Sequence, residues 1–188
     1  MKKQLTVQQH DYKLMKSISL DKQLLSLNMK LIKNIEAQIK IIEDDIEDVI
    51  SNDEKLNKQQ KLIKSVPGVG KVLSWTLLSK TEGFTTIQDP RKMACYSGVL
   101  PFEFQSGTSL KKRPEVSMLA DKALKTILHL AAMSAIRSNN DLSAYYLRKV
   151  TEGKNKMSVL NAVRNKIIHR VFAVIKNQIP YQKDLVLS

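Results

Sequence analysis

Apolar residues recur at alternating spacings of three and four through the first quarter of the chain. This heptad pattern is typical of a long helix that packs against another helix. No Pro or Gly occurs before residue 67, so we predict one helix over residues 17–51, about 50 Å long at 1.5 Å per residue. Residues 1–16 form an N-terminal extension in this prediction. Nine of the eleven positions in the pattern are apolar: Leu14, Ile18, Asp21, Leu25, Asn28, Ile32, Ile35, Ile39, Ile42, Ile46 and Val49.

A helix of this length cannot bury its apolar stripe on itself, so it needs an antiparallel neighbour, a partner chain, or both. We favour a coiled coil between copies of the chain, a homodimer or higher oligomer through residues 17–51, over an intramolecular bundle. Asn28 and Asp21 would set its register. The carboxylates at 43–48 point around the helix in different directions, so we expect a solvated acidic face and no metal site. After Ser51–Asp53 a short helix to about Lys64 completes a linker region, residues 17–64.

A tight turn follows this linker, with the sequence Val66-Pro67-Gly68-Val69-Gly70-Lys71 between two apolar helical stretches. The two glycines permit positive φ and close backbone approach, and the valine between them can anchor the turn. Backbone N–H groups at the start of the second helix, together with the lysine, would form an anion site. We therefore predict a helix-hairpin-helix motif that binds a DNA phosphate. A plain helix–helix turn is the alternative.

Helical spacing of apolar residues continues to the end of the chain. We predict an all-α protein, with the long coiled-coil helix followed by a compact helical domain at 65–180 and a tail at 181–188. In this prediction Leu119 faces the core, whereas Arg164 and Arg170 lie outside or at the edge of the last helix. Four further helices are predicted. The first begins at Asp89–Pro90, and the second runs from Met118 to Arg137 with Ser117 as its cap. The third includes residues 143–149, and the fourth runs from Met157 to Asn177.

The stretch from Ser97 to Pro114 does not have a helical pattern. Its centre is Gln105-Ser106-Gly107, followed by the basic residues Lys111, Lys112 and Arg113. Basic groups near a hydroxyl can hold a phosphodiester and stabilise charge in a transition state. The residues alone leave two interpretations open: Ser106 is a nucleophile, or the segment is an ordinary turn with solvated phosphate contacts.

Charge favours nucleic acid as the partner. The 188 residues include 31 Lys and Arg against 18 Asp and Glu, a net charge of +13, and every arginine lies after residue 66. A basic but inert surface is the alternative. No stretch of 18 apolar residues occurs, so we expect no membrane span. The single cysteine, Cys95, excludes an intrachain disulfide, fits a cytoplasmic location, and is expected in the core. The isolated histidines His10, His129 and His169 are expected to be surface or core residues.

The order of these motifs resembles a known family. It is similar to that of insertion-sequence transposases that pair an N-terminal RuvC-like DEDD domain with a C-terminal serine domain. These are the bridge-RNA-guided DNA recombinases. The motifs that follow one another in this order are Val66-Pro67-Gly68-Val69-Gly70, Phe84, the run Met93 to Pro101, Gln105-Ser106-Gly107, and Leu124-Lys125. The resemblance covers about residues 60–180, and the heptad helix before it is similar to the coiled coil that links the two domains.

The resemblance implies that Ser106 attacks a DNA phosphodiester and forms a covalent protein–DNA link. In the resemblance Gln105 and Gly107 are the motif neighbours of this serine, and Gly68 and Gly70 match the family hairpin. Taken with the residue patterns above, we expect nucleic-acid contacts from Gly68, Gly70, Lys71, Gln105, Gly107, Lys111, Lys112, Arg113 and Lys125. The family commonly has a Ser-Lys pair, a Gly and an Arg after the basic loop, whereas this chain has Ser117-Met118, Ala120 and Lys125. We expect the DEDD domain, which in the family would hold Mg²⁺, to be absent from this chain. We therefore expect a C-terminal portion with no cofactor of its own and a guide RNA as further partner.

Two other functions remain open at this stage. The chain could be a non-catalytic, dimeric nucleic-acid-binding module, or an inactive transposase remnant, in which Ser106 is an ordinary turn residue. It could also be a coiled-coil adaptor whose basic face meets acidic proteins. A steep dependence of nucleic-acid binding on salt would distinguish either nucleic-acid function from the adaptor.

Overall fold

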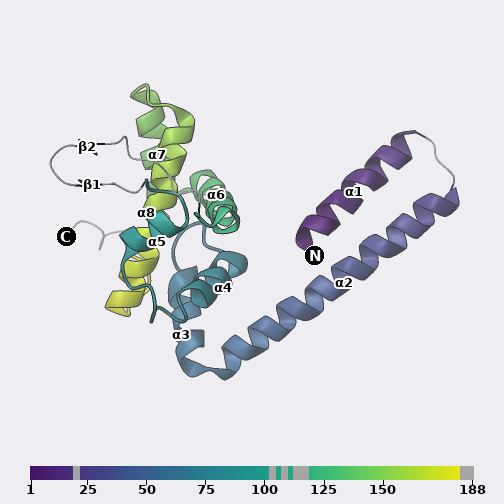
Figure 1. Cartoon of the computed structure of the whole chain (residues 1–188), viewed down its shortest axis with the longest axis horizontal. Helices are drawn as coiled ribbons and strands as arrows, with labels where there is room; N and C mark the ends of the chain where they lie inside the picture. Colours follow the sequence, from purple (N-terminus) through teal and green to yellow (C-terminus); the bar gives the residue numbers. More distant parts are fainter. Residues whose placement is uncertain (19–21, 102–104, 107–109, 112–118, 183–188) are drawn as a thin grey trace. The chain divides into compact units, whose positions relative to one another are not determined.

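The computed structural model describes residues 1–18, 22–101, 105–106, 110–111 and 119–182. Its fold is all-α, as predicted, and the described strands are a single antiparallel pair of two residues each. The chain divides into two units, Met1–Asp53 and Glu54–Ser188. Figure 1 shows the helices of each unit.

The first unit is a helical hairpin of α1 (Lys2–Ser17) and α2 (Lys22–Asn52). The two helices pack against each other, and Figure 1 shows them side by side. A hydrogen bond of 3.2 Å from Gln9 to Glu36 and an ion pair between Lys2 and Glu43 show that they are antiparallel. Ile32 of α2 is buried, 5% exposed. The chain thus supplies an antiparallel neighbour for α2 itself, while the coiled coil between copies stays a prediction.

The predicted helix over 17–51 is wrong at its start, and the predicted extension at 1–16 is a helix. Helix α1 ends at Ser17, whose hydroxyl donates to the Leu14 carbonyl at 2.7 Å, and the Ile18 N–H donates to the same carbonyl at 3.2 Å. Such a side-chain bond competes with helix continuation. Leu14 therefore lies in α1 and Ile18 follows that helix as its C-cap, whereas the heptad positions from Leu25 to Val49 lie in α2.

The second unit is built around its last helix, α8 (Lys156–Asn177), which packs against α3 (Glu54–Lys64), α5 (Pro90–Tyr96), α6 (Lys122–Arg137) and α7 (Asp141–Thr151). Helix α4 (Lys71–Lys80) packs on α3 and α6. Because α3 packs within this unit, the boundary lies at residue 53 rather than at the predicted 64. An edge-to-face contact of 5.0 Å between Phe84 and Phe172 lies in this core.

Local sequence explains where these helices begin and end. Asp89 caps α5, with its carboxylate accepting the Arg91 N–H at 2.8 Å, as predicted. The predicted start of α6 is wrong, because Asp121 rather than Ser117 caps it, accepting the Leu124 N–H at 2.9 Å. Leu119 therefore precedes the helix and is 93% exposed instead of facing the core. The cap predicted at Ser117 lies outside the described residues.

The described helices include none that is both long enough and apolar enough to cross a membrane. Likewise, the described part of the chain brings together no group of three metal-ligating side chains. Cys95 is buried, as expected.

Candidate nucleic-acid interface

The turn between α3 and α4 has the anchored geometry that the sequence predicts. The Val66 N–H donates to the Ile63 carbonyl at 3.2 Å, and the Val69 N–H donates to the Val66 carbonyl at 3.1 Å. Both valines are buried, at 1% and 8% exposure. The apolar anchor is therefore present, whereas its binding of a DNA phosphate stays a prediction.

The two glycines of this turn serve different purposes. Gly68 has φ of +84°, and a Cβ there would lie 2.4 Å from the Ala131 carbonyl oxygen of α6. Gly70 is the N-cap of α4, and a Cβ there would meet nothing within 4 Å. Gly68 is thus required for packing, while Gly70 leaves space in front of the first N–H groups of α4, where an anion is favoured. Lys71, the first residue of α4, is exposed.

The segment that contains Ser106 is fixed to the helical core at both ends. Before it, the Val99 carbonyl accepts a hydrogen bond from Asn161 of α8 at 2.9 Å. After it, the Asp121 N–H donates to the Tyr96 carbonyl at 2.9 Å, and the Asp121 carboxylate pairs with Lys80 of α4 at 3.1 Å. The Leu124 N–H and this ammonium group hold the pKa of Asp121 below its usual value. The segment therefore leaves from, and returns to, one place between α5 and α6.

Within this segment the structure describes two short strands, β1 (Gln105–Ser106) and β2 (Leu110–Lys111). They pair antiparallel, with Gln105 opposite Lys111 and Ser106 opposite Leu110. The backbone of the predicted nucleophile is thus close to that of one predicted basic residue. Gly107, Lys112 and Arg113 lie outside the described residues. Lys125 is half-buried on α6.

Sequence reasoning missed a polar cluster between α6 and α8. Arg164 is 6% exposed rather than on the outside. Its Nη2 lies 2.6 Å from His129 Nδ1, and its Nη1 donates to Asn161 Oδ1 at 3.2 Å. Burial lowers the pKa of Arg164. A signal was available, because positions 160, 163, 164, 167 and 168 form one helical face and all of these residues except Arg164 are apolar.

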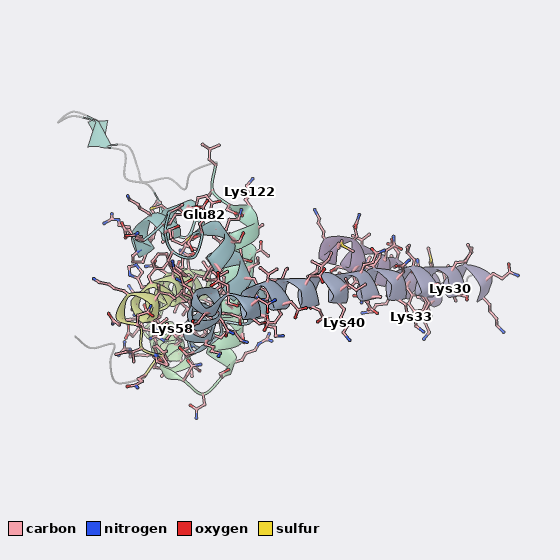
Figure 2. The ribbon with its side chains drawn as sticks, turned by 90° about the horizontal axis from the view of Figure 1, so that it is seen from below. Lys30, Lys33, Lys40, Lys58, Glu82 and Lys122 are labelled. Carbon is pink, nitrogen blue, oxygen red and sulfur yellow. The ribbon has the colours of Figure 1, made fainter. Side chains whose placement is uncertain are left out.

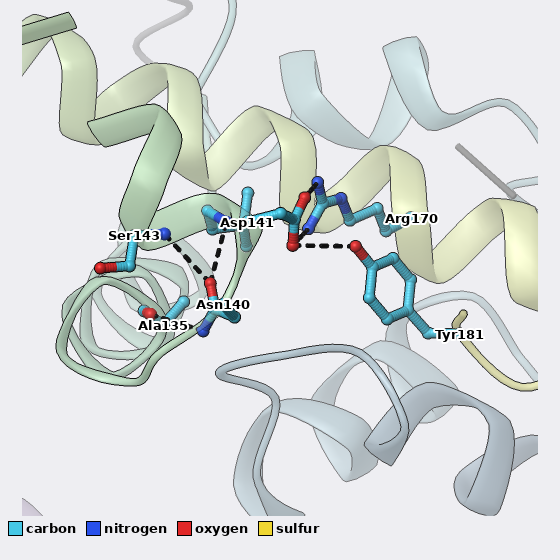
Figure 3. Close-up of polar contacts among 7 residues, drawn as sticks. Ala135, Asn140, Asp141, Ser143, Arg170 and Tyr181 are labelled. Carbon is cyan, nitrogen blue, oxygen red and sulfur yellow. Dashed lines mark hydrogen bonds and ion pairs between the residues drawn. The ribbon is translucent and has the colours of Figure 1, made fainter. Parts of the chain in front are cut away.

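The second buried arginine is also placed differently from the prediction. Arg170, 8% exposed, makes two contacts to the Asp141 carboxylate, which also accepts a hydrogen bond of 2.9 Å from the Tyr181 hydroxyl. Figure 3 shows the carboxylate bonded both to the guanidinium and to the phenol. Burial alone would raise the pKa of Asp141, but the bonds from Arg170 and Tyr181 outweigh it and lower that pKa. Burial and the carboxylate raise the pKa of Tyr181 to about 12.

This cluster joins α7, α8 and the chain after α8. The Tyr181 N–H donates to Ser65 Oγ at 2.8 Å, next to the α3–α4 turn. Asn140 caps α7, accepting from the N–H groups of Leu142 and Ser143 at 2.8 and 3.0 Å. Both charged groups of the cluster, the Arg170 guanidinium and the Asp141 carboxylate, are paired with each other within the unit. We therefore assign the cluster a structural role.

Comparison with known proteins finds similarity to a transposase family, to gene-inverting proteins and to an insertion-element protein. Residues 60–147, a little under half of the chain, match the model of the family described as Transposase IS116/IS110/IS902 family. The pilin gene-inverting proteins of Moraxella bovis and Moraxella lacunata are each 25% identical over 132 residues, 70% of this chain and 41% of those proteins. An uncharacterized 42 kDa protein of insertion element IS900 from Mycobacterium paratuberculosis is 27% identical over 128 residues, 66% of this chain and 31% of that protein.

The chain thus spans about two fifths or less of the length of these relatives. The similarities support a transposase or recombinase as the class of protein to which it is related. All ten predicted site residues lie within the region matched by the family, whereas Asn161 and Arg164 lie after it.

Proposed function

We propose that this chain is the C-terminal portion of an insertion-sequence transposase, a DNA recombinase that binds DNA and a guide RNA and supplies Ser106 as nucleophile. The observation that carries the proposal is the family match over residues 60–147, which includes both the α3–α4 turn and the serine segment. The relatives include a protein named as gene-inverting and one from an insertion element.

The chemistry assigned to Ser106 is nucleophilic substitution at phosphorus. Its hydroxyl oxygen gives up its proton and forms a bond to a backbone phosphorus while the bond from that phosphorus to one sugar oxygen breaks, and the released sugar oxygen takes up a proton. The resulting phosphoserine ester is a covalent intermediate, which conserves the phosphodiester for joining to a new strand. Fixing the ends of the serine segment at Val99 and Asp121 supports this role, because a nucleophile acts best from a rigid base.

Cationic and backbone groups near the serine would hold the DNA. Lys111 is opposite Gln105 in the strand pair, and in the proposal Lys112 and Arg113 add charge next to it. Gly70 and Lys71 at the start of α4 would bind a further phosphate through backbone N–H groups and an ammonium group. Such contacts position the chain without reading bases.

Oligomerisation through residues 17–51 belongs to the same proposal. Helix α1 covers only one side of α2, and several large apolar residues of α2 are at least 45% exposed within the chain. A second copy would cover them, and two nucleophiles would be brought to the two strands of a recombination site. These residues are Leu24, Leu27, Leu31, Ile41, Ile42 and Val49.

A trapping assay tests the proposed function. The chain is mixed with labelled element-end DNA, guide RNA, and a separately supplied DEDD domain with Mg²⁺, and denaturing gels are searched for a protein–DNA band. We expect a band with the wild type and with Ser109→Ala, which removes a hydroxyl from the same segment, but none with Ser106→Ala. A band that survives Ser106→Ala would refute the assignment. Salt-sensitive binding by every variant with no covalent band would instead indicate a non-catalytic nucleic-acid-binding module.

A further inference from the structure

We propose that Arg164 and His129, together with Lys125, form a phosphate site on the α6–α8 surface that binds the sugar–phosphate backbone of nucleic acid. The site is separate from the α3–α4 turn and from the basic residues 111–113. It rests on the proposed function in one respect, namely that the chain binds nucleic acid. Its ligand chemistry is a phosphodiester anion, which DNA and RNA share.

Arg164 is held in a fixed orientation. Asn161 donates through Nδ2 to the Val99 carbonyl at 2.9 Å, so its Oδ1 is directed to Arg164 Nη1 at 3.2 Å. On the other side, Arg164 Nη2 contacts His129 Nδ1 at 2.6 Å. The guanidinium is therefore preorganised between two helices, which lowers the entropy that a ligand contact must overcome.

Among the residues that the structure describes, no carboxylate compensates the charge of Arg164. The ion pairs of the described residues include no carboxylate partner for it, and its buried Nε has no hydrogen-bond partner. Arg170 provides an internal comparison: it is buried to nearly the same extent, 8% against 6% exposed, yet it has the carboxylate of Asp141. A buried cation without an anion is unfavourable. An incoming phosphate would supply the missing negative charge.

The histidine contact specifies a second donor. A guanidinium has only N–H groups to offer, so His129 Nδ1 must accept, and the ring proton then lies on Nε2. The hydrogen bonds of the described residues give this Nε2–H group no acceptor, so in the proposal it donates to a phosphate oxygen. His129 is half-buried, as is Lys125 one turn earlier on α6, so both lie partly at the surface.

Lysines on α6 extend the site to solvent. Lys122, Lys125 and His129 are spaced by three and four residues and therefore share one face of the helix. Lys122 is exposed, and Figure 2 shows it at the start of α6. A backbone strand that follows this face would place one phosphate against Arg164. The Asn161 bond to Val99 connects that site to the base of the serine segment.

Two measurements on the same variants test the proposal. Fluorescence anisotropy gives the affinity of the full chain for a 20-base-pair DNA duplex, and separately for a 20-nucleotide single-stranded RNA, at several salt concentrations. Thermal unfolding without nucleic acid gives Tm. For Arg164→Met we expect about a tenfold loss of affinity, as for one charge-assisted contact, and a salt slope smaller by about 0.9 for the duplex or about 0.7 for the RNA. We expect Tm to be unchanged or higher, because an uncompensated buried charge is removed.

Two further variants make the result decisive. Arg137→Met removes one exposed charge from the end of α6, and we expect it to change affinity and slope less than Arg164→Met does. Arg164→Lys keeps a charge, so it retains the slope even if the guanidinium geometry is lost, and it keeps the test valid if the methionine variant fails to fold.

The outcomes are separable. A lower Tm for Arg164→Met with unchanged affinity and slope would make Arg164 a structural residue and overturn the inference. Equal losses for Arg164→Met and Arg137→Met would reduce the effect to net charge and also overturn it. Wild-type chain that binds neither the duplex nor the RNA would refute the proposed function and, with it, this site. The arm in which the slope changes identifies which nucleic acid occupies the site.

Discussion

Asp141→Asn tests whether the Arg170 cluster holds the second unit together. The carboxylate accepts two hydrogen bonds from Arg170 and one from Tyr181 (Figure 3). In either orientation of the substituted amide, its NH₂ group faces a donor of the guanidinium. The substitution therefore removes the negative charge and creates one repulsive donor–donor contact, while volume and shape are kept.

The size of the effect follows from burial. Removing one partner of a buried ion pair costs about 3–5 kcal/mol. The side chain of Asp141 is 29% exposed and that of Arg170 8%, so water can solvate the remaining charge in part, and we expect about 3 kcal/mol. The second unit has about 135 residues, for which the unfolding entropy is about 0.28 kcal/mol/K. Tm should therefore fall by about 10 °C.

Differential scanning calorimetry at pH 7 measures this change directly. Tyr181→Phe is the matched control, since it removes one neutral hydroxyl from the same carboxylate and should cost only about 1 kcal/mol, or 3–4 °C. The double variant Asp141→Leu with Arg170→Met removes both charges and should be less destabilised than Asp141→Asn. A fall of under 3 °C for Asp141→Asn, or a double variant that is worse than the single one, would refute the reasoning.

Two further predictions concern the turn and acid stability. Gly68→Ala should lower Tm by 10 °C or more, because it combines strain at positive φ with a contact of 2.4 Å to the Ala131 carbonyl oxygen. Gly70→Ala, the control, should shift Tm by no more than about 3 °C. Equal changes of Tm in calorimetry would contradict the packing argument. The lowered pKa of Asp141 gives stability that is present above its unfolded value near 4 and is lost as pH falls through the folded value. The Tm difference between wild type and Asp141→Asn should hold from pH 7 to 5 and shrink below about pH 4, and a constant difference down to pH 2 would contradict it.

Sequence signals predicted those elements whose ends depend on local chemistry. Asp89 followed by Pro90 is a cap and a first helical residue, and the structure has α5 starting there. The valine-anchored turn at 66–70 is likewise a short-range pattern, and its buried Val69 was expected. In each case the side chain that fixes the backbone is within a few residues of the backbone that it fixes, so no tertiary information is needed.

The remaining features depend on contacts between distant residues. The heptad pattern continues through Ser17, so it could not reveal that α1 turns back along α2. Ser117 and Asp121 are both acceptable caps, and Asp121 is the one that also meets Lys80 of α4. Arg164 is buried and contacts His129 of α6, 35 residues away in the sequence, which a count of polar residues on α8 does not show. The nucleophile and its basic neighbours, in contrast, were indicated by motif order and remain a prediction for the trapping assay.

The bond between the Tyr96 carbonyl and the Asp121 N–H has an evolutionary consequence. Because the serine segment begins and ends at neighbouring points, its length adds little to the entropy of closing it: halving such a loop changes the closure free energy by only about 0.6 kcal/mol. The stretch between Tyr96 and Asp121 can therefore diverge, lengthen or be exchanged between related proteins while the described helices keep folding. Selection can therefore change the sequence of the proposed reactive segment almost independently of the stability of the helical scaffold.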